Sequence, residues 1–383
     1  MAWDDLTGQA EAIATMRAAA TDDGMTHSWL ITGPPGSGRS ILAYAFASAL
    51  IARPGDEAST DLLVEKRTHP DLGVLSTDRV LISIEEVRQL VASSQFSPSV
   101  GRYRVMIIED ADRMTERTSN VLLKALEEPP PRTVWILCAP SEADLIPTIR
   151  SRVRTVRLRV PAVEEVAELI ARRDDVSLPE ATRAAREAQS HIGMAHRLAT
   201  NEEARERRRR TLELALGIRS VAGAVVAAGE LVEVATADGK AITEEKDAEE
   251  RDSALRSLGI EPGGSVPPGL RAQLKALEDD QKRRATRSLR DGIDRILVDL
   301  LSLYRDILLL QLGVEQEPVN LAIYADLTVA AAQSTPARTL ATLDAITTAR
   351  ERIEGNVAPA LALESMLISA VRDPAAAGKD RTP

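Results

Sequence analysis

The residues best suited to chemistry lie in one stretch at 33–40, which has the sequence GPPGSGRS. An apolar run precedes it and a helical pattern follows it, so the stretch joins a buried strand to the start of a helix. Glycines let backbone N–H groups turn toward an anion, and the helix N-terminus adds positive dipole. We therefore predict a phosphate loop. Its candidate nucleotide-binding residues are Gly33, Gly36, Gly38, Arg39 and Ser40.

Position 39 of this loop departs from the usual pattern, because Arg39 stands where such loops carry a lysine. Lysine is a compact charge that reaches the β and γ phosphates, whereas arginine is a wide planar fork. Two interpretations follow. Either Arg39 binds phosphate in a rearranged pocket, or the loop shapes the fold and supports no hydrolysis.

A second group of candidates, Glu109 and Asp110, directly follows an apolar run at 103–108. In a phosphate-loop ATPase the end of such a strand supplies an Asp to the magnesium shell and then a Glu to polarise the attacking water. Here the order is reversed, so the side chain at each of the two positions is one methylene longer or shorter than in an active ATPase. A misplacement of about 1 Å can cost on the order of a hundredfold in rate. The structural alternative is that these residues, or Asp112, cap the following helix.

The elements that must position these residues alternate along the first 160 residues. Continuous apolar runs predict strands, and helical periodicity lies between them, which indicates a parallel sheet covered on both faces. From residue 162 onward the strand signal vanishes. We expect about three helices over 162–200, long helices over 211–236 and 270–371, and a mobile hairpin or loop at 237–269.

Composition describes an ordinary globular chain of two or three domains, with 383 residues, 44% hydrophobic and 28% charged. The net charge of -10 argues against a simple nucleic-acid binder, so DNA contact must be local or shared with partners. The basic run at 205–210 is expected to be a solvated helix face, with a contact to DNA or an acidic partner as the alternative. A single cysteine, Cys138, excludes an intrachain disulfide and a cysteine zinc site. Without a signal-peptide pattern or membrane-span pattern, we expect a cytoplasmic protein.

Several motifs resemble those of bacterial clamp-loader ATPases, a group within the AAA+ family. They are NVLLKALEEPP at 120–130, IRSRV at 149–153, HPD at 69–71 and NVAPALALE at 356–364. The second is similar to the Ser-Arg-Cys motif of the group, with Val153 in place of the cysteine. The resemblance covers most of residues 1–200 and the last helices, and it is strongest to the delta-prime subunits of DNA polymerase III.

This resemblance implies an α/β fold followed by an all-α part. An AAA+ phosphate-loop core with a parallel sheet would span 1–160, a small helical lid 161–205 and a helical collar 206–373. A short tail at 374–383 is expected to be disordered.

The resemblance also implies roles for single residues. Clamp-loader subunits form a five-membered ring of delta, delta-prime and three ATP-hydrolysing chains, with each active site between neighbours. Arg152, next to Ser151, matches the arginine finger that acts in trans; a surface ion pair is the alternative. Ser141 matches a first sensor residue, although it could simply bond the backbone. His196 and the following arginine lie near the position of a lid arginine.

The leading hypothesis is a stator-like ring subunit that hydrolyses nothing itself and lends Arg152 to a neighbour. Its partners would be the tau/gamma and delta subunits, the sliding clamp and, through the assembled ring, primer–template DNA. No cofactor is expected in its own site, with binding of ATP and magnesium as the alternative, and zinc is not expected because 51–68 contains no cysteine. The other hypotheses are an active tau/gamma-like ATPase and an AAA-derived scaffold outside replication.

Overall fold

The computed structural model describes residues 3, 6–21, 26–77, 81–257, 271–355 and 357–371, with side chains between 241 and 284 only in part. The chain divides into two compact units, Met1–Thr200 and Asn201–Pro383. The tail at 374–383, residue Asn356 of the 356–364 motif and the 258–269 part of the predicted loop lie outside the described residues. None of the helices within the described ranges is long and apolar enough to cross a membrane.

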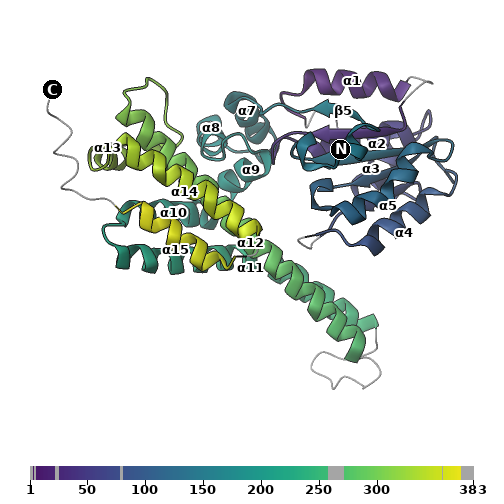
Figure 1. The fold of residues 1–383 in the computed structure, drawn as a ribbon. Helices are drawn as coiled ribbons and strands as arrows, with labels where there is room; N and C mark the ends of the chain where they lie inside the picture. Colours follow the sequence, from purple (N-terminus) through teal and green to yellow (C-terminus); the bar gives the residue numbers. More distant parts are fainter. Residues whose placement is uncertain are drawn as a thin grey trace. The chain divides into compact units, whose positions relative to one another are not determined.

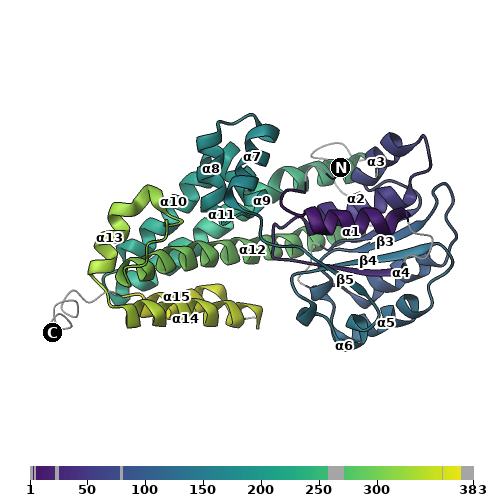
Figure 2. The same cartoon turned by 90° about the horizontal axis from the view of Figure 1, so that it is seen from above.

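The first unit is built on a five-stranded sheet (Figures 1 and 2). Its strands are β1 (Ser28–Thr32), β2 (Leu72–Leu75), β3 (Arg104–Ile108), β4 (Thr133–Ala139) and β5 (Arg154–Arg157). All pairings are parallel, in the order β2-β3-β4-β1-β5. The predicted parallel sheet is confirmed. Because the carboxyl ends of parallel strands meet at one edge, the loops after β1, β3 and β4 are neighbours there.

Helices cover both faces of the sheet, as expected. They are α1 (Ala10–Thr21), α2 (Arg39–Ile51), α3 (Glu57–Glu65), α4 (Ile84–Ser94), α5 (Glu116–Glu127) and the single turn α6 (Pro147–Arg150). Alternate residues of β4 show why two layers are needed: Ile136 packs with α1 and α2, whereas Trp135 packs with α4 and α5. Each strand therefore buries side chains on both sides.

Three helices end the first unit: α7 (Val163–Asp174), α8 (Leu178–Glu187) and α9 (Ile192–Thr200). This agrees with the three helices expected over 162–200. Ser177 begins α8 as its N-cap, and an ion pair between His196 and Asp174 joins α9 to the end of α7 at 2.7 Å. Alanines fill the interface, with Ala181, Ala185 and others fully buried.

The second unit is entirely helical within its described residues. Its helices are α10 (Glu202–Gly217), α11 (Val221–Ser257), α12 (Arg271–Gln311), α13 (Tyr324–Ala332), α14 (Pro336–Glu354) and α15 (Pro359–Ser369). Figures 1 and 2 both show α11 and α12 side by side. The expected long helices are thus present, and their apolar faces form one core around Leu231, Leu300 and Leu363.

The predicted loop at 237–269 is wrong for residues 237–257, which continue α11. The stretch contains few apolar residues, so it lacks the periodic pattern of an amphipathic helix. Its contacts with α12 stabilise it instead: Arg251 pairs with Glu278 at 3.6 Å, and Gln281 donates to the Asp247 carbonyl at 2.9 Å. A Cβ at Gly239 would lie 3.1 Å from the Ser288 hydroxyl, so the two helices approach closely.

The expectation of a solvated face at 205–210 is also wrong for two of its arginines. Arg208 is 9% exposed; its Nε lies 3.0 Å from Asp299 and its Nη2 donates to Asn320 at 2.7 Å. Arg207 pairs with Asp238 at 2.6 Å. These guanidinium groups turn toward α12 and α11 because carboxylates there compensate their burial.

Candidate functional site

The phosphate loop has the conformation that its glycines predict. It connects β1 to α2, and Gly36 and Gly38 have φ of 78° and 96°, in the left-handed region that favours glycine. The loop also meets the start of α9. Ile192 N–H donates to the Gly36 carbonyl at 3.3 Å, and a Cβ on Gly36 would lie 2.3 Å from the His191 ring. Only glycine therefore fits beneath His191.

Groups that would face a phosphate are turned onto the loop itself. The Arg39 guanidinium donates from Nη1 to the Gly33 carbonyl. Ser37 N–H donates to the Pro34 carbonyl at 3.1 Å, and its hydroxyl, in a residue only 2% exposed, has no hydrogen-bond partner among the described residues. The arginine that replaces the usual lysine thus donates a hydrogen bond to a carbonyl of its own loop.

Glu109 lies at the same sheet edge and is surrounded by donors. Its Oε1 accepts from the Tyr44 hydroxyl at 2.5 Å and pairs with Arg67 Nη2 at 3.0 Å, while the Ser40 hydroxyl lies 3.4 Å from Oε2. The Glu109 side chain is 13% exposed. Burial, followed by the hydrogen bond to Glu109, raises the pKa of Tyr44, so the phenol stays protonated and donates.

The other two acidic candidates do not join Glu109 in one cluster. Asp110 has φ of 50° and its carboxylate lies 3.7 Å from Arg113. Burial, and then the charge of Asp110, raise the pKa of Asp112. Asp110 is the N-cap residue of the 3-10 turn Ala111–Arg113 but makes no side-chain cap hydrogen bond there, and α5 is capped by Thr115, which accepts from the Thr118 N–H at 3.3 Å.

Magnesium, which this fold would hold between a loop hydroxyl and a strand-end carboxylate in an ATPase, does not fit these side chains. Glu109 already carries a guanidinium and two hydroxyls. No group of three metal-binding side chains occurs among the residues that the structure describes. We therefore derive no step through a metal in this pocket.

Ser141 lies close to the phosphate loop. It lines a pocket of about 270 Å³ at the ends of β1, β4 and β5, together with Thr32, Gly33, Pro34, Pro140, Glu142, Arg157 and Leu158. Its hydroxyl accepts from the Ala143 N–H at 3.2 Å and its own N–H donates to Asp144 at 2.8 Å. The side chain thus bonds the backbone, as the structural alternative has it.

Arg152 lies apart from this pocket, in the turn between α6 and β5. Its Nε donates to Glu127 at 2.6 Å, and its Nη1 donates to the Thr148 carbonyl at 2.7 Å and to Ser151 Oγ at 3.1 Å. The side chains of Arg152 and Glu127 are 33% and 45% exposed. In the isolated chain Arg152 therefore forms the surface ion pair that was the alternative to the finger.

His196, expected near the position of a lid residue that reaches the nucleotide, makes a different contact in the structure. His196 points to Asp174 on α7, at 2.7 Å, and therefore not toward the phosphate loop. The loop is met by His191 instead, whose Nδ1 accepts from the Met194 N–H at 3.2 Å. His191 directly precedes α9, five residues before His196.

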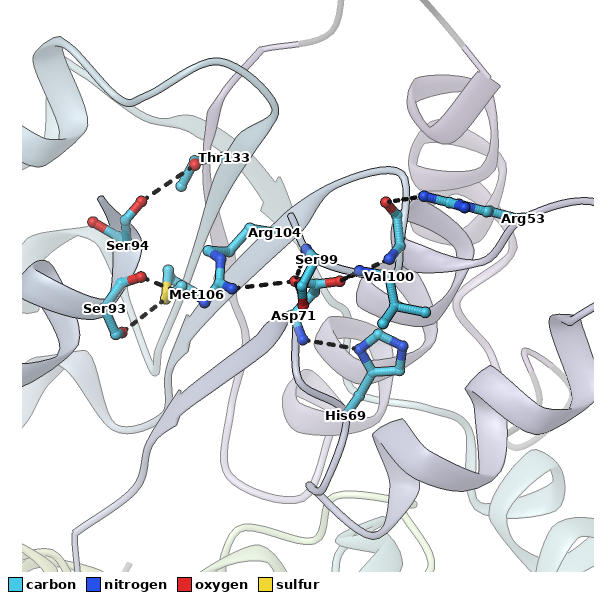
Figure 3. A network of polar contacts seen from close by, with 11 residues as sticks. Arg53, His69, Asp71, Ser93, Ser94, Ser99, Val100, Arg104, Met106 and Thr133 are labelled. Atoms are coloured by element: carbon cyan, nitrogen blue, oxygen red, sulfur yellow. Dashed lines mark hydrogen bonds and ion pairs between the residues drawn. The ribbon is translucent and has the colours of Figure 1, made fainter. Parts of the chain in front are cut away.

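The HPD motif at 69–71 has a structural role, shown in Figure 3. Asp71 is fully buried, and its carboxylate accepts from the backbone N–H groups of Ser99, Val100 and Gly101 at 2.6 to 2.8 Å. It also pairs with Arg104 at 3.2 Å. Burial alone would raise the pKa of Asp71, but these hydrogen bonds lower it to about 2. The ionised carboxylate fixes the loop before β3, and hence the position of Glu109.

Sequence reasoning missed four residues that shape the site: Tyr44, Arg67, Glu127 and His191. Glu127 stands in the quoted 120–130 motif and is the last residue of α5, so its contact with the IRSRV motif could have been suspected. Tyr44, Arg67 and His191 carry no pattern of their own. Their roles depend on contacts between distant segments.

Comparison with known proteins relates the first unit to one group of subunits. Residues 8–162 match the family described as "DNA polymerase III, delta subunit". The chain is 33% identical over 154 residues to the DNA polymerase III subunit delta-prime of Pseudomonas aeruginosa, which covers 38% of this chain and 47% of that protein. It is 33% identical over 160 residues to the delta-prime subunit of Haemophilus influenzae, with 39% and 48% covered.

Other proteins are also similar to this chain. The tau/gamma subunit of Haemophilus influenzae is 28% identical over 174 residues, which cover 44% of this chain and 25% of that protein. A gamma subunit-related protein of Thermotoga maritima has a solved structure with a TM-score of 0.44, 17% identity, and 94% and 98% of the two chains covered. The chain spans about half the length of the delta-prime relatives it matches. Residues 8–162 of this chain are therefore similar to the delta-prime subunits of DNA polymerase III.

Proposed function

We propose that this chain is a stator-like, delta-prime-type subunit of a clamp loader, which supplies Arg152 in trans to the ATP site of a neighbouring subunit. Its partners are the tau/gamma and delta subunits, and the assembled ring loads the sliding clamp onto primed DNA. Basic side chains on the ring would contact DNA phosphates in a salt-sensitive way, without base recognition. The chain's own pocket takes no cofactor, and zinc has no role.

One observation carries this proposal: the pocket is engaged by its own side chains, while the arginine turn is exposed. Arg39 bonds the Gly33 carbonyl, and Arg67 pairs with Glu109. By contrast, Ser151 is exposed and Arg152 makes a pair with a half-exposed glutamate. A guanidinium that reaches a neighbour's γ-phosphate stabilises charge in the transition state, so hydrolysis comes to depend on assembly.

The role of Arg152 is tested with the complete ring. The chain, as wild type or Arg152→Ala, is reconstituted with the ATP-hydrolysing and delta subunits of its own source, and ATP turnover is measured with clamp and primed DNA. We expect turnover at the site that this chain completes to fall by about 10³-fold, with assembly intact by gel filtration. Arg150→Ala, which removes a neighbouring exposed arginine, is the matched control. Unchanged turnover with Arg152→Ala would remove the proposal.

An active tau/gamma-like ATPase is the second candidate, since tau/gamma subunits match a slightly longer segment than the delta-prime subunits do. The two candidates differ in what the purified chain does alone. Magnesium-dependent ATP turnover by the isolated chain would favour the second. The arrangement of Arg39, Glu109 and Arg67 supports the first.

A further inference from the structure

Arg67 is held in an unusual position for an arginine. It follows the C-terminus of α3 with φ of 56°, in the left-handed region that non-glycine residues rarely adopt. Two backbone bonds fix this turn: Arg67 N–H donates to the Val64 carbonyl and Thr68 N–H to the Leu63 carbonyl, each at 2.9 Å. The backbone conformation at Arg67 therefore fixes the direction of its side chain independently of the contacts in the pocket.

The side chain of Arg67 extends to the sheet edge. Its guanidinium carbon lies 5.2 Å from the centre of the Tyr44 ring, and Nη2 lies 3.0 Å from Glu109 Oε1. Tyr44 in turn donates to the same carboxylate oxygen. An aromatic face, a phenol and a carboxylate thus hold one positive charge at the end of β3.

This is the neighbourhood in which a phosphate-loop ATPase places magnesium. There the metal is held by the loop Ser or Thr and by an acidic residue at a strand end. The corresponding groups here are Ser40 and Glu109, whose side chains lie 3.4 Å apart. Magnesium requires several oxygen ligands at 2.0–2.1 Å in octahedral geometry. Arg67 and Tyr44 occupy one oxygen of Glu109, so only the oxygen beside Ser40 is left, and the positive charge of Arg67 lies next to it.

We propose that Arg67 takes the place of the magnesium ion in this pocket, so that the chain carries its own fixed cation and binds no divalent metal there. The guanidinium neutralises Glu109 as the metal would. It is not a Lewis acid and cannot lower the pKa of a bound water, so it provides charge without activating a nucleophile. This inference rests on the proposed function, and it gives a physical reason why the chain's own pocket is inactive. It concerns the isolated chain, and no partner is needed to test it.

The test uses magnesium alone as the probe, on the full chain. Thermal unfolding is followed by tryptophan fluorescence, since all three tryptophans lie in the first unit. Samples contain about 10 mM MgCl2 or NaCl of equal ionic strength, a concentration at which a millimolar site adds measurable stability. We expect the same Tm for the wild type in both salts. In Arg67→Asn, which tolerates the left-handed backbone and frees Glu109, magnesium should raise Tm by about 3 °C.

A matched control removes an arginine from a similar pair at the same sheet edge. Arg157 Nη2 also lies 3.0 Å from a glutamate, Glu142, and Arg157→Asn should show no response to magnesium. The double variant with Arg67→Asn and Glu109→Gln should lose the response. If circular dichroism shows Arg67→Asn unfolded, Arg67→Gln replaces it, since its stem still covers Tyr44.

The magnesium experiment and the ring assay test the two proposals separately. A magnesium response in the wild type, or none in the folded Arg67 variant, overturns the inference. Neither result bears on the role of Arg152, which is tested only by ATP turnover of the reconstituted ring. Loss of turnover with Arg152→Ala, together with a magnesium-responsive wild type, would keep the proposed function and remove only the metal replacement.

Discussion

Two arginine–glutamate pairs of the first unit have the same chemistry and different surroundings. In the enclosed pair, Arg67–Glu109, the glutamate is 13% exposed and both of its oxygens have neighbouring donors. In the exposed pair, Arg152–Glu127, the glutamate is 45% exposed and its recorded contacts use one oxygen. The first pair lies in the chain's own pocket, and the second lies on a surface turn.

This difference decides which arginine can leave its partner. An exposed ion pair contributes about 0–1 kcal/mol, because water and salt solvate both ions after separation. Arg152 can therefore exchange Glu127 for a more highly charged phosphate at little cost. If Arg67 left, Glu109 would remain in a poorly hydrated pocket without its cation, which is unfavourable. The surroundings thus keep one arginine in place and make the other available.

An ion pair with a fully buried carboxylate should contribute the most to the free energy of unfolding. Asp71, paired with Arg104 and three backbone N–H groups, is 0% exposed. We expect Asp71→Asn to lower the free energy of unfolding of the first unit by about 3–5 kcal/mol, since Arg104 loses its compensating charge. Urea unfolding followed by tryptophan fluorescence measures it. Asp144→Asn, which changes an exposed carboxylate with one backbone N–H, is the control and should cost under ~1 kcal/mol.

The same carboxylate predicts sensitivity to acid. The pKa of Asp71 is about 2 in the folded chain and about 4 in an unfolded one, so its ionised form stabilises the fold. That contribution, about 2 kcal/mol, is complete above pH 5 and is lost as the pH falls toward 2. Unfolding at pH 7 and pH 3 should show about half of this loss in the wild type. If Asp71→Asn loses as much stability between pH 7 and pH 3 as the wild type does, other titrating groups cause the loss.

Double-mutant cycles compare the two pairs directly. For the enclosed pair, the cycle of Arg67→Asn and Glu109→Gln should give a coupling free energy of about 1–2 kcal/mol, because Glu109 is mostly desolvated while Arg67 is half exposed. For the exposed pair, Arg152→Ala with Glu127→Gln should give under ~0.5 kcal/mol. Equal couplings would refute the distinction between them.

The smallest effect is expected for Glu127 in the assembled ring. Because the exposed pair is weak, Glu127→Gln should change ATP turnover by less than about threefold while Arg152 still acts. Glu128→Gln, at the adjacent position of the same motif, is the control. A loss as large as that of Arg152→Ala would mean that Glu127 itself positions the arginine in the working complex.

Much of the fold could be predicted because its signals are local. Strands β1 to β4 are mostly apolar, and Gly36 and Gly38 have the positive φ that the loop between β1 and α2 requires. The same patterns predicted Ser40 in the phosphate loop and Glu109 at the end of a strand, whereas Ser141 was assigned from the family resemblance. The parallel order of strands then follows from alternation with helices.

The remainder depended on contacts between distant residues. Arg67 comes from a polar stretch, and nothing near it in sequence indicates that it reaches Glu109. The helix at 237–257 has charged contacts with α12 in place of an apolar stripe, so periodicity could not reveal it. Arg208 is one of several basic residues in a run, and only its partner Asp299, on another helix, explains its burial.

The central claim is that this chain's pocket is idle while its arginine serves another site. One measurement tests both halves: ATP turnover by the reconstituted ring carrying either Ser40→Ala or Arg152→Ala in this chain. The account predicts turnover close to wild type with Ser40→Ala and a loss with Arg152→Ala. A ring that is disabled by Ser40→Ala and insensitive to Arg152→Ala would contradict it.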